Sequence, residues 1–409
     1  MPPRYTVERL AYEDEDLGSI DLPKARMDIR SGFGSGLSRR PGDPPDVVWA
    51  VGDRGPNLKA KTARKIYGVE GLEEHERGSG AKLMPRLDLG PAIARLRVRE
   101  DRVELMETFR IACRDGTAVS GLPIPGGEHA RSEPALGFDG KILPPDPSGM
   151  DTEGIVALPD GFWLGDEYGP SLIRLDGEGR VLRRLMPERK DLEGAAYPVE
   201  TCLPAIAARR QLNRGFEALT LSPDGRHLFL AFQSPLAHPD EATHEQARHV
   251  RLWRLDAETG AIEMEWLYPL DAPETFRRDV AKGEFGRSDV KVSEICALGE
   301  GSLLVLERGS ETTRIYRVEP SEDLALPAEH LDVATRPTLE ERSARGEDLP
   351  ALAKHLLVDT DENPEVAADL EGIAILSPTE LLLVSDNDFG VEGAKTSFWR
   401  VRFEEPVLG

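Results

Sequence analysis

Four glutamates stand at the same place in four related segments of the chain. Each precedes a short run of apolar residues, as in "DTEGIVALPDGFWLGDEYGP" from residue 151 and "DLEGIAILSPTELLLVSDNDFG" from residue 369. The four residues are Glu153, Glu217, Glu294 and Glu371. Carboxylates that converge in a folded protein repel one another unless a positive charge neutralises them. The pattern therefore predicts a site for a hard cation with oxygen ligands, Ca²⁺ first and Mg²⁺ or Mn²⁺ next.

A second polar cluster follows the next apolar run of each segment. These clusters are Asp53-Arg54, Asp166-Glu167, Gln233, Glu307-Arg308 and Asp386-Asn387. In an antiparallel hairpin the end of the second strand returns to the start of the first, so both clusters should share one face. Asp386 and Asn387 are predicted as further metal ligands, since the Asn amide adds a neutral oxygen beside the carboxylates.

The same clusters supply candidate residues for binding and turnover of a substrate. Arg54 and Arg308 are predicted to bind an anionic group, because a guanidinium holds a phosphate or carboxylate through two hydrogen bonds. Asp53 is assigned to the same substrate-binding set. Asp166 or Glu167 would activate water. Each acidic residue could instead cap a turn or pair with an arginine across strands.

The repeated segments have the pattern of β-propeller blades. Apolar runs of four to six residues, split by Asp-Gly or other Gly-containing turns, predict β-hairpins. In residues 151–181 the alternation continues into a third strand and a fourth. Four antiparallel strands make a propeller blade, and the innermost strands line a central channel. Equivalent positions on those strands would then form a ring.

The spacing of the segments predicts an all-β, six-bladed propeller in a single domain, residues 1–409. The units start at residues 35, 153, 217, 294 and 371, with Ser35 where the others have Glu. The first interval is nearly two units long, and its strand-like segment 94–111 would form a sixth blade without the acidic residue. The strand-like segment 397–405 would close the ring beside the N-terminal strand.

Other segments are expected to connect the blades. Residues 200–212 and 347–360 carry apolar residues at helical spacing, which predicts short helices between blades. Residues 112–150 are rich in Gly and Pro and are expected to form a long surface loop over one face. The sequence "HEQARH" at 244–249 spaces its histidines five apart, so it lacks the spacing of a helical zinc site.

Composition excludes several kinds of partner. The chain has 51 Lys and Arg against 74 Asp and Glu, a formal charge of −23. Neither a nucleic acid nor an anionic membrane fits that charge. We expect a monomer that acts on a small-molecule anionic ester. The three cysteines are too few and too widely spaced for a disulfide framework.

The N-terminal residues and the hydropathy indicate a location. "MPPRYTVERLAYEDEDLG" has no apolar signal segment, and no stretch reaches the roughly 20 apolar residues of a membrane span. These features predict a soluble cytoplasmic protein, or a periplasmic one if the true start lies upstream. No serine nucleophile elbow, phosphate-binding loop or dinucleotide fingerprint is present.

The quoted segments resemble the phytase-like family of bacterial propeller proteins, also called "esterase-like activity of phytase". The resemblance extends over about residues 30 to 400 and includes "NRGFEALTLSPDGRHLFLAFQSPL" at 213–236. It implies a β-propeller that hydrolyses esters, phosphate esters among them.

A second resemblance concerns the Glu-Gly pair that begins an inner strand. It is similar to the metal-binding start in calcium-dependent gluconolactonases and paraoxonase-type lactonases, which are six-bladed propellers. Carried over, Glu153 and Glu371 match this motif, whereas Glu217 and Glu294 lack the following Gly. In those enzymes the axial metal polarises a substrate oxygen.

Three functional hypotheses follow from these patterns. The first is a metal-dependent hydrolase of esters, particularly phosphate esters, with its site at the axial mouth of the propeller. The second is a non-catalytic propeller that binds a partner protein or a small anion, because a fold does not settle function. The third is a calcium-dependent lactonase, which shares the metal site and differs in substrate.

Overall fold

The computed structural model describes residues 2–76, 80–127, 132–187 and 192–408. Within them the structure is all-β, with a few short helices, and five sheets of four or five strands dominate. Each sheet is a propeller blade that contains four antiparallel strands, as the alternating segments predict. The predicted β-propeller is therefore confirmed.

Each blade runs from an inner strand at the axis to an outer strand at the rim. Blade 1 holds β4 (Gly36–Ser38), β5 (Val47–Val51), β8 (Ala92–Val98) and β9 (Val103–Arg110). Blade 2 holds β11 (Thr152–Leu158), β12 (Gly161–Asp166), β13 (Ser171–Asp176), β14 (Val181–Pro187) and β15 (Val199–Leu203). Blade 3 holds β16 (Phe216–Leu221), β17 (His227–Phe232), β18 (His249–Asp256) and β19 (Ile262–Pro269). Blade 4 holds β20 (Lys291–Ala297), β21 (Leu303–Arg308), β22 (Thr313–Val318) and β23 (Lys354–Asp359). Blade 5 holds β24 (Leu370–Ser377), β25 (Glu380–Ser385), β26 (Ser397–Phe403) and β1 (Tyr5–Leu10).

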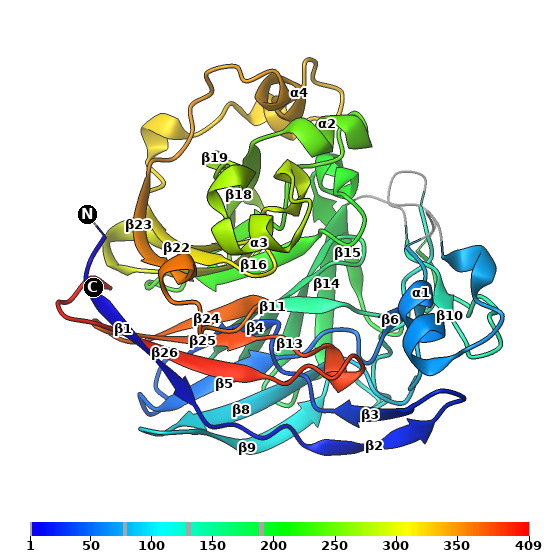
Figure 1. The fold of residues 1–409 in the computed structure, drawn as a ribbon. Coiled ribbons are helices and arrows are strands. Elements are labelled where there is room, and N and C mark those ends of the chain that lie inside the picture. The colour runs from blue at the N-terminus through cyan, green and yellow to red at the C-terminus, as the bar shows by residue number, and fades with distance from the viewer. Residues whose placement is uncertain (1, 77–79, 128–131, 188–191, 409) are drawn as a thin grey trace.

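The innermost strands of the five blades form a closed ring. Strand β11 contacts both β4 and β16, β20 contacts β16 and β24, and β24 returns to β4. These strands meet near the centre of the ribbon (Figure 1). β11 is buried on both faces because it packs between neighbouring blades. The ring brings residues from five distant parts of the chain to one axis.

The predicted sixth blade is wrong. The strand-like segment 94–111 forms most of β8 and β9, which are the two outer strands of blade 1. The interval between the first two acidic segments is long because blade 1 receives insertions between its strands and after its last strand. The described part of the chain therefore closes its ring with five blades.

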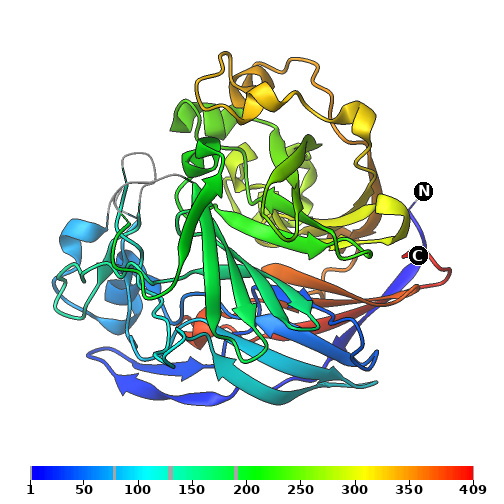
Figure 2. The ribbon, with the colours of Figure 1, turned by 180° about the vertical axis from the view of Figure 1, so that it is seen from behind.

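The predicted closure of the ring by the two ends of the propeller is confirmed. β1 pairs antiparallel with β26 along its whole length, from Tyr5 opposite Phe403 to Leu10 opposite Phe398. The N- and C-terminal ends lie close together in both views (Figures 1 and 2). Blade 5 therefore takes three strands from the end of the chain and one from its beginning.

The two predicted inter-blade helices are wrong. Residues 200–212 form most of β15, which pairs with β14, and a short 3₁₀ turn. Residues 347–360 contain β23, the outer strand of blade 4. In both segments a free strand edge of the preceding sheet was available, and pairing with it prevailed over the helical spacing of a short apolar run.

The remaining elements are short. The small sheets comprise β2 (Asp16–Asp21) with β3 (Arg26–Arg30), and β6 (Leu58–Lys59), β7 (Lys82–Leu83) and β10 (Ala135–Leu136). The α-helices are α1 (Ala60–Thr62), α2 (Glu241–Gln246), α3 (Arg277–Lys282) and α4 (Leu339–Ala344). The π turn is η1 (Ala63–Tyr67), and the 3₁₀ turns are Glu73–His75, Ala205–Arg209, Pro273–Thr275, Arg287–Asp289, Gly299–Gly301, Glu322–Leu324, Ala328–Leu331, Thr360–Glu362 and Asp388–Gly390. No helix among the described residues is long and apolar enough to cross a membrane.

A cap built from insertions stands beside one end of the ring. It consists of β6, α1, η1 and β7, with β10 paired to β7, and it lies to one side of the blades in both views (Figures 1 and 2). The predicted loop at 112–150 contributes β10 and is otherwise irregular where it is described; residues 128–131 lie outside the described residues. The cap supplies side chains that no blade strand could place at the site.

Loss of the contacts that close the ring should destabilise the whole propeller. Leu10 is buried against Phe398 and other residues of blades 1 and 5, whereas Thr6 on the same strand is exposed. We expect Leu10→Ala to lower the free energy of unfolding by about 2–4 kcal/mol and Thr6→Ala by less than about 0.5 kcal/mol. Denaturant unfolding of both variants measures the difference. Equal values would show that β1 is only loosely attached.

Candidate functional site

A β-bulge recurs at the start of four inner strands. In blade 3, Phe216 pairs with Phe232 and Ala218 with Ala231, so Glu217 has no partner residue. The pairing of β11, β20 and β24 shifts in the same way. The residues left at the bulge are Glu153, Glu217, Ser293 and Glu371. A bulge redirects a side chain, and Glu153, Glu217 and Glu371 line the axial cavity, whereas Ser293 accepts a hydrogen bond from Arg308.

Glu294 lies one residue beyond the equivalent position, contrary to its place in the sequence pattern. Its carboxylate accepts hydrogen bonds from the backbone N–H groups of Leu37 (3.4 Å), Leu219 (3.4 Å) and Ile295 (3.1 Å). These donors belong to three inner strands. Burial raises the pKa of Glu294 well above its ordinary value. Glu294 is therefore buried between the inner strands and is not part of the cavity that the other three glutamates line.

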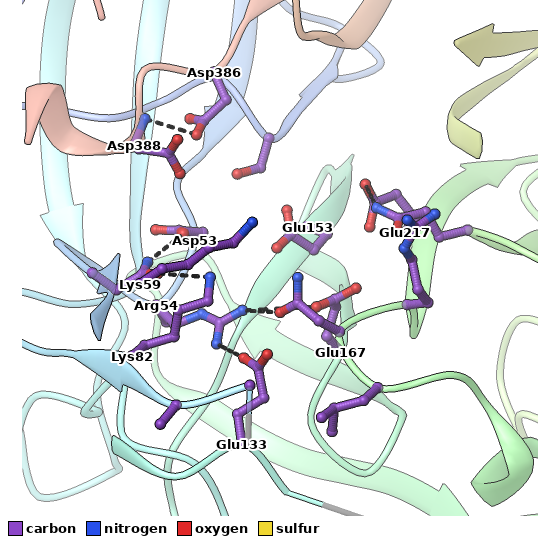
Figure 3. Close-up of a pocket in the computed structure, with 18 of the residues that line it drawn as sticks. Asp53, Arg54, Lys59, Lys82, Glu133, Glu153, Glu167, Glu217, Asp386 and Asp388 are labelled. Atoms are coloured by element: carbon purple, nitrogen blue, oxygen red, sulfur yellow. Dashed lines mark hydrogen bonds and ion pairs between the residues drawn. The ribbon is translucent and has the colours of Figure 1, made fainter. Parts of the chain in front are cut away.

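A cavity of about 500 Å³ opens where the bulges lie (Figure 3). The starts of the inner strands contribute Ser35, Glu153, Glu217 and Glu371. The polar clusters that follow the second strands contribute Asp53, Glu167, Gln233, Arg308 and Asp386. At least one residue of every second cluster lines the cavity together with the start of an inner strand, whereas Asp166, Glu307 and Asn387 do not line it. The cap and connecting loops add further charged residues, among them Lys59, Lys82 and Glu133.

The charges in the cavity are of both signs. Among the described residues, nine carboxylates line it, Asp53, Glu76, Glu133, Glu153, Glu167, Glu217, Glu371, Asp386 and Asp388, and seven Lys and Arg side chains do, Arg54, Lys59, Lys61, Lys82, Arg214, Lys291 and Arg308. In Figure 3, Lys59 and Lys82 lie on one side of Glu153, and Glu217 lies on the other. The mouth is therefore a mixed ionic site and not a uniformly acidic one.

Asp166 does not reach the cavity, although the sequence analysis made it a catalytic candidate. Strand alternation turns it to the opposite face from Glu167. It is fully buried, forms an ion pair with Arg184, and accepts a hydrogen bond from Ser171 Oγ (2.5 Å). Its oxygen also accepts from the backbone N–H of Asp151 (2.7 Å). Asp166 is thus a structural residue that fixes the start of β11.

Asn387 also forms its hydrogen bonds outside the cavity. Its amide donates to Ser31 O (2.8 Å) and accepts from the N–H of Phe389 (2.9 Å). It is buried and does not line the cavity, whereas its neighbour Asp386 does. The predicted ligand pair is therefore divided, with only Asp386 at the mouth.

Both predicted substrate-binding arginines are held by carboxylates. Arg54 Nη1 lies 2.6 Å from Glu133, and its Nη2 lies 2.5 Å from Asp151 and 3.8 Å from Glu167. The guanidinium also donates to the side chain of Asn213. Arg54 therefore acts as the centre of a buried ionic cluster, and few of its donors are left for a ligand.

Arg308 is anchored in the next part of the ring. Its Nε donates to Ser293 Oγ (2.8 Å), its Nη1 pairs with Asp369 (3.0 Å), and its Nη2 pairs with Glu371. Ser293 occupies the position that glutamate has in the other bulges. Blade 4 thus has a small hydroxyl where three other blades have a carboxylate, and this hydroxyl leaves room for the guanidinium of Arg308.

Burial and mutual repulsion disfavour ionisation of the ring carboxylates. Burial is the largest cause of the raised pKa of Glu153, followed by Glu217 and Asp151. The pKa of Glu217 is likewise raised well above its ordinary value by burial, then by Glu167 and Glu371. Burial brings the pKa of Glu371 to about 7. The protein alone does not compensate the negative charge gathered here.

Two further carboxylates of the cavity, Asp53 and Asp386, also have raised pKa values. Burial, then Asp388 and Glu371, raise the pKa of Asp386 well above its usual value. Burial brings the pKa of Asp53 to about 6, although Arg54 opposes the shift. A cation bound among these groups would favour their charged forms.

Three oxygens in the lining have no hydrogen-bond partner in the part of the chain that the structure describes. They are Ser35 Oγ, Glu217 Oε2 and Gln233 Oε1, and each belongs to a side chain that is at least nine-tenths buried. Gln233 Nε2 donates to Glu217 Oε1 (2.5 Å), which fixes both residues. Buried oxygens without partners are costly, so their presence indicates a ligand that they would bind.

One group of carboxylates has the spacing of a metal site. Asp151, Glu153 and Glu167 can each offer an oxygen, and these oxygens lie within 4.8 Å of one another. Glu167 Oε1 accepts from the N–H of Gly215 (3.0 Å), which orients the side chain. The donor set of carboxylate, amide and hydroxyl oxygens suits a hard cation.

The sequence analysis missed several residues of the site. Asp151 stands two residues before Glu153, and Asp369 stands two residues before Glu371, so this repeated aspartate could have been noticed in the sequence. Glu133, Lys59 and Lys82 come from insertions that share no pattern with the blades. Only the folded structure brings them to the axis.

The fold and the cavity define a β-propeller with a charged axial site. Residues 30–389 match the family described as "Phytase-like: Esterase-like activity of phytase", and the chain belongs to this family. The resemblance seen in the repeated segments is thereby confirmed.

A curated relative is an uncharacterized secreted protein from Arthroderma benhamiae. It is 27% identical over 324 residues, which cover 70% of this chain and 60% of the relative. The chain thus spans well under two thirds of that relative's length. The description as a secreted protein contradicts our prediction of a cytoplasmic location.

Solved structures give weaker likenesses. A luciferin-regenerating enzyme is 12% identical, with a TM-score of 0.38 and coverage of 98% of this chain and 96% of that one. Regucalcin, a calcium-binding protein from Agrobacterium tumefaciens, is 11% identical with a TM-score of 0.33, covering 92% and 94%. The periplasmic gluconolactonase of Pseudomonas aeruginosa is 10% identical with a TM-score of 0.31, covering 96% and 95%. Likenesses of this size carry no argument about function.

The different roles of Asp166 and Glu167 can be separated by stability. Asp166→Asn leaves the buried Arg184 without its counter-charge, so we expect a loss of about 3 kcal/mol or more in the free energy of unfolding. Glu167→Gln removes one of several crowded carboxylates and should change stability by less than about 1 kcal/mol. Denaturant unfolding of the two variants tests this. A stable Asp166→Asn protein would contradict the structural role.

Proposed function

We propose that this protein is a metal-dependent hydrolase of esters, with its site in the axial cavity. The family carries the description of an esterase-like activity. The observation that carries the proposal is the set of buried oxygens at the mouth, Ser35 Oγ, Glu217 Oε2 and Gln233 Oε1, that lack partners among the described residues. They stand beside carboxylates whose ionisation the protein opposes.

The residues at the mouth fit a divalent cation. Glu153 and Glu217 would hold it, and Asp386 would do so from the blade 5 side of the cavity. Ca²⁺ is the first choice, because six to eight oxygens in an irregular cage suit it better than Mg²⁺. When bound, such an ion polarises the phosphoryl or carbonyl oxygen of an ester.

The cations in the cavity favour an anionic substrate, and phosphate esters in particular. Arg214 and Lys291 line the same cavity as the acidic ring, and neither forms an ion pair with a carboxylate of the described residues. A neutral lactone would leave their charges without a partner. A mixed lining of this kind can bind a cation and an anion side by side.

The chain's own residues would carry the proton transfer. Glu167 is held by the N–H of Gly215 and faces the cavity, so we assign to it the activation of water. It accepts a proton as the water oxygen bonds to the phosphorus or carbonyl carbon. The bond to the alcohol oxygen breaks, and the leaving oxygen takes up a proton from solvent. Asp166, behind the strand, has no part in this step.

Two further aspects of this proposal concern location and alternatives. The secreted relative supports a site of action outside the cytoplasm. The non-catalytic propeller and the calcium-dependent lactonase remain the competing functions, and the two experiments below distinguish them.

Calcium binding should depend on the ring. We expect Ca²⁺ to raise the melting temperature of the wild type and to bind measurably in calorimetry, whereas Glu217→Gln should bind at least tenfold more weakly because it loses a charged ligand. In chelator Glu217→Gln should be as stable as the wild type or more so, since it removes a buried, repelled carboxylate.

The control for this experiment is Glu200→Gln, the same change at an exposed residue of β15, where the carboxylate pairs with Arg183. It should leave calcium binding unchanged. If the wild type neither binds nor is stabilised by any divalent cation, the metal part of the proposal is wrong.

Turnover can be tested with matched substrates. We expect the metal-loaded protein to hydrolyse phosphomonoesters or phosphodiesters faster than uncharged carboxylic esters and lactones, and chelation to abolish the activity. Glu167→Gln should lower kcat by about 10²-fold or more with little change in stability. Hydrolysis of lactones alone would favour the lactonase, and no turnover on any of these classes would favour a binding propeller.

A further inference from the structure

Blade 4 places two cations opposite each other at the cavity. Lys291 is the first residue of β20, and its direct partner on β21 is Arg308. Both line the cavity. Like charges on directly opposite residues destabilise a sheet, so a pair at this position requires compensation. Arg308 receives it from Glu371 and Asp369, but Lys291 has no ion pair with any described carboxylate.

Arg214 adds a third cation from the neighbouring blade. It lies two residues before β16 and lines the same cavity. No described carboxylate lies within ion-pair distance of it, and its buried Nη1 has no hydrogen-bond partner among the described residues. Arg308 lowers the pKa of Lys291, burial and Arg214 lower it further, and the pKa falls to about 8. The three cations therefore lie near one another.

These cations are also separated from the basic residues of the cap. Glu217 and Glu371 interact with Lys291, and Figure 3 shows Glu217 on the far side of Glu153 from Lys59 and Lys82. The group formed by Arg214, Lys291 and Arg308 is thus a distinct cationic wall between blades 3 and 4. It stands next to the glutamates assigned to the cation.

We propose that Arg214 and Lys291 bind a phosphoryl group of the substrate between blades 3 and 4, with Arg308 as the fixed charge behind them. The proposal rests on the hydrolase function proposed above and names the recognition group of its substrate. It also replaces Arg54, whose guanidinium is occupied by Glu133 and Asp151.

The chemistry of the two side chains favours a phosphoryl group over a single carboxylate. Arg214 offers a planar pair of donors, and Lys291 offers a compact charge with three. A tetrahedral dianion has enough oxygens to accept from both and to face a cation on its other side. A carboxylate has two oxygens and one charge, and it would satisfy only one of these cations.

Inorganic phosphate is the probe for this site, measured by calorimetry in chelator so that neither a metal nor turnover is required. We expect phosphate to bind the wild type, and Lys291→Gln and Arg214→Gln each to weaken it about tenfold or more, because each removes a charge-assisted hydrogen bond. Acetate should bind more weakly than phosphate. Lys59→Gln makes the same change on the opposite side of the cavity and should weaken phosphate binding less than threefold.

A stability readout separates binding from a structural role. Lys291→Gln removes a like-charge pair, so without phosphate its melting temperature should equal or exceed that of the wild type. A lower melting temperature with unchanged phosphate affinity would overturn the proposal, as would equal losses in Lys59→Gln and Lys291→Gln. Selective loss of phosphate binding without any ester hydrolysis would uphold this subsite and refute the hydrolase function. Ester hydrolysis with unchanged phosphate affinity in Lys291→Gln and Arg214→Gln would uphold the hydrolase function and refute this subsite.

Discussion

Repulsion between carboxylates that the propeller forces together is the constraint on which the rest of the site depends. The inner strands all begin at one end of the channel, so a side chain repeated at their bulges must converge there. Burial makes this convergence more costly, as the raised pKa values of Glu153 and Glu217 show. The molecule tolerates the cost only through charges placed around the ring.

The way in which each charge at a strand end is neutralised depends on the side of the strand that it faces. Residues that face the cavity, such as Glu167 and Arg308, interact with charged residues of neighbouring blades. Their immediate neighbours in sequence face backward and are neutralised locally: Asp166 by Arg184, and Glu307 by Lys354 (2.8 Å). One Asp-Glu or Glu-Arg pair therefore divides into an outward-facing structural ion and an inward-facing functional one. Such division explains why paired charges recur at the strand ends.

The sequence predicted the blades and the site unequally. Period-two alternation and turns identified the hairpins, and the repeated glutamate located the cavity, because both are local signals. The predicted number of blades is wrong because β8 and β9 carry no repeated acidic residue, so the sequence did not show to which sheet they belong. The prediction that Glu294 is a metal ligand is wrong because the bulge in β20 lies one residue earlier, at Ser293, and the spacing of the sequence does not reveal this shift. The cations of the cap and of Arg214 depend on long-range packing alone.

The pairing of β1 with β26 has a consequence for how the molecule is made. The other four blades lie between these two strands in the sequence, so blade 5 cannot be completed until β26 has been synthesised. Closing so long a loop is entropically slow and is among the last events in folding. The acidic ring therefore assembles late, and a nascent chain holds its glutamates apart. Any ion or substrate that requires the whole ring binds only after the propeller has closed.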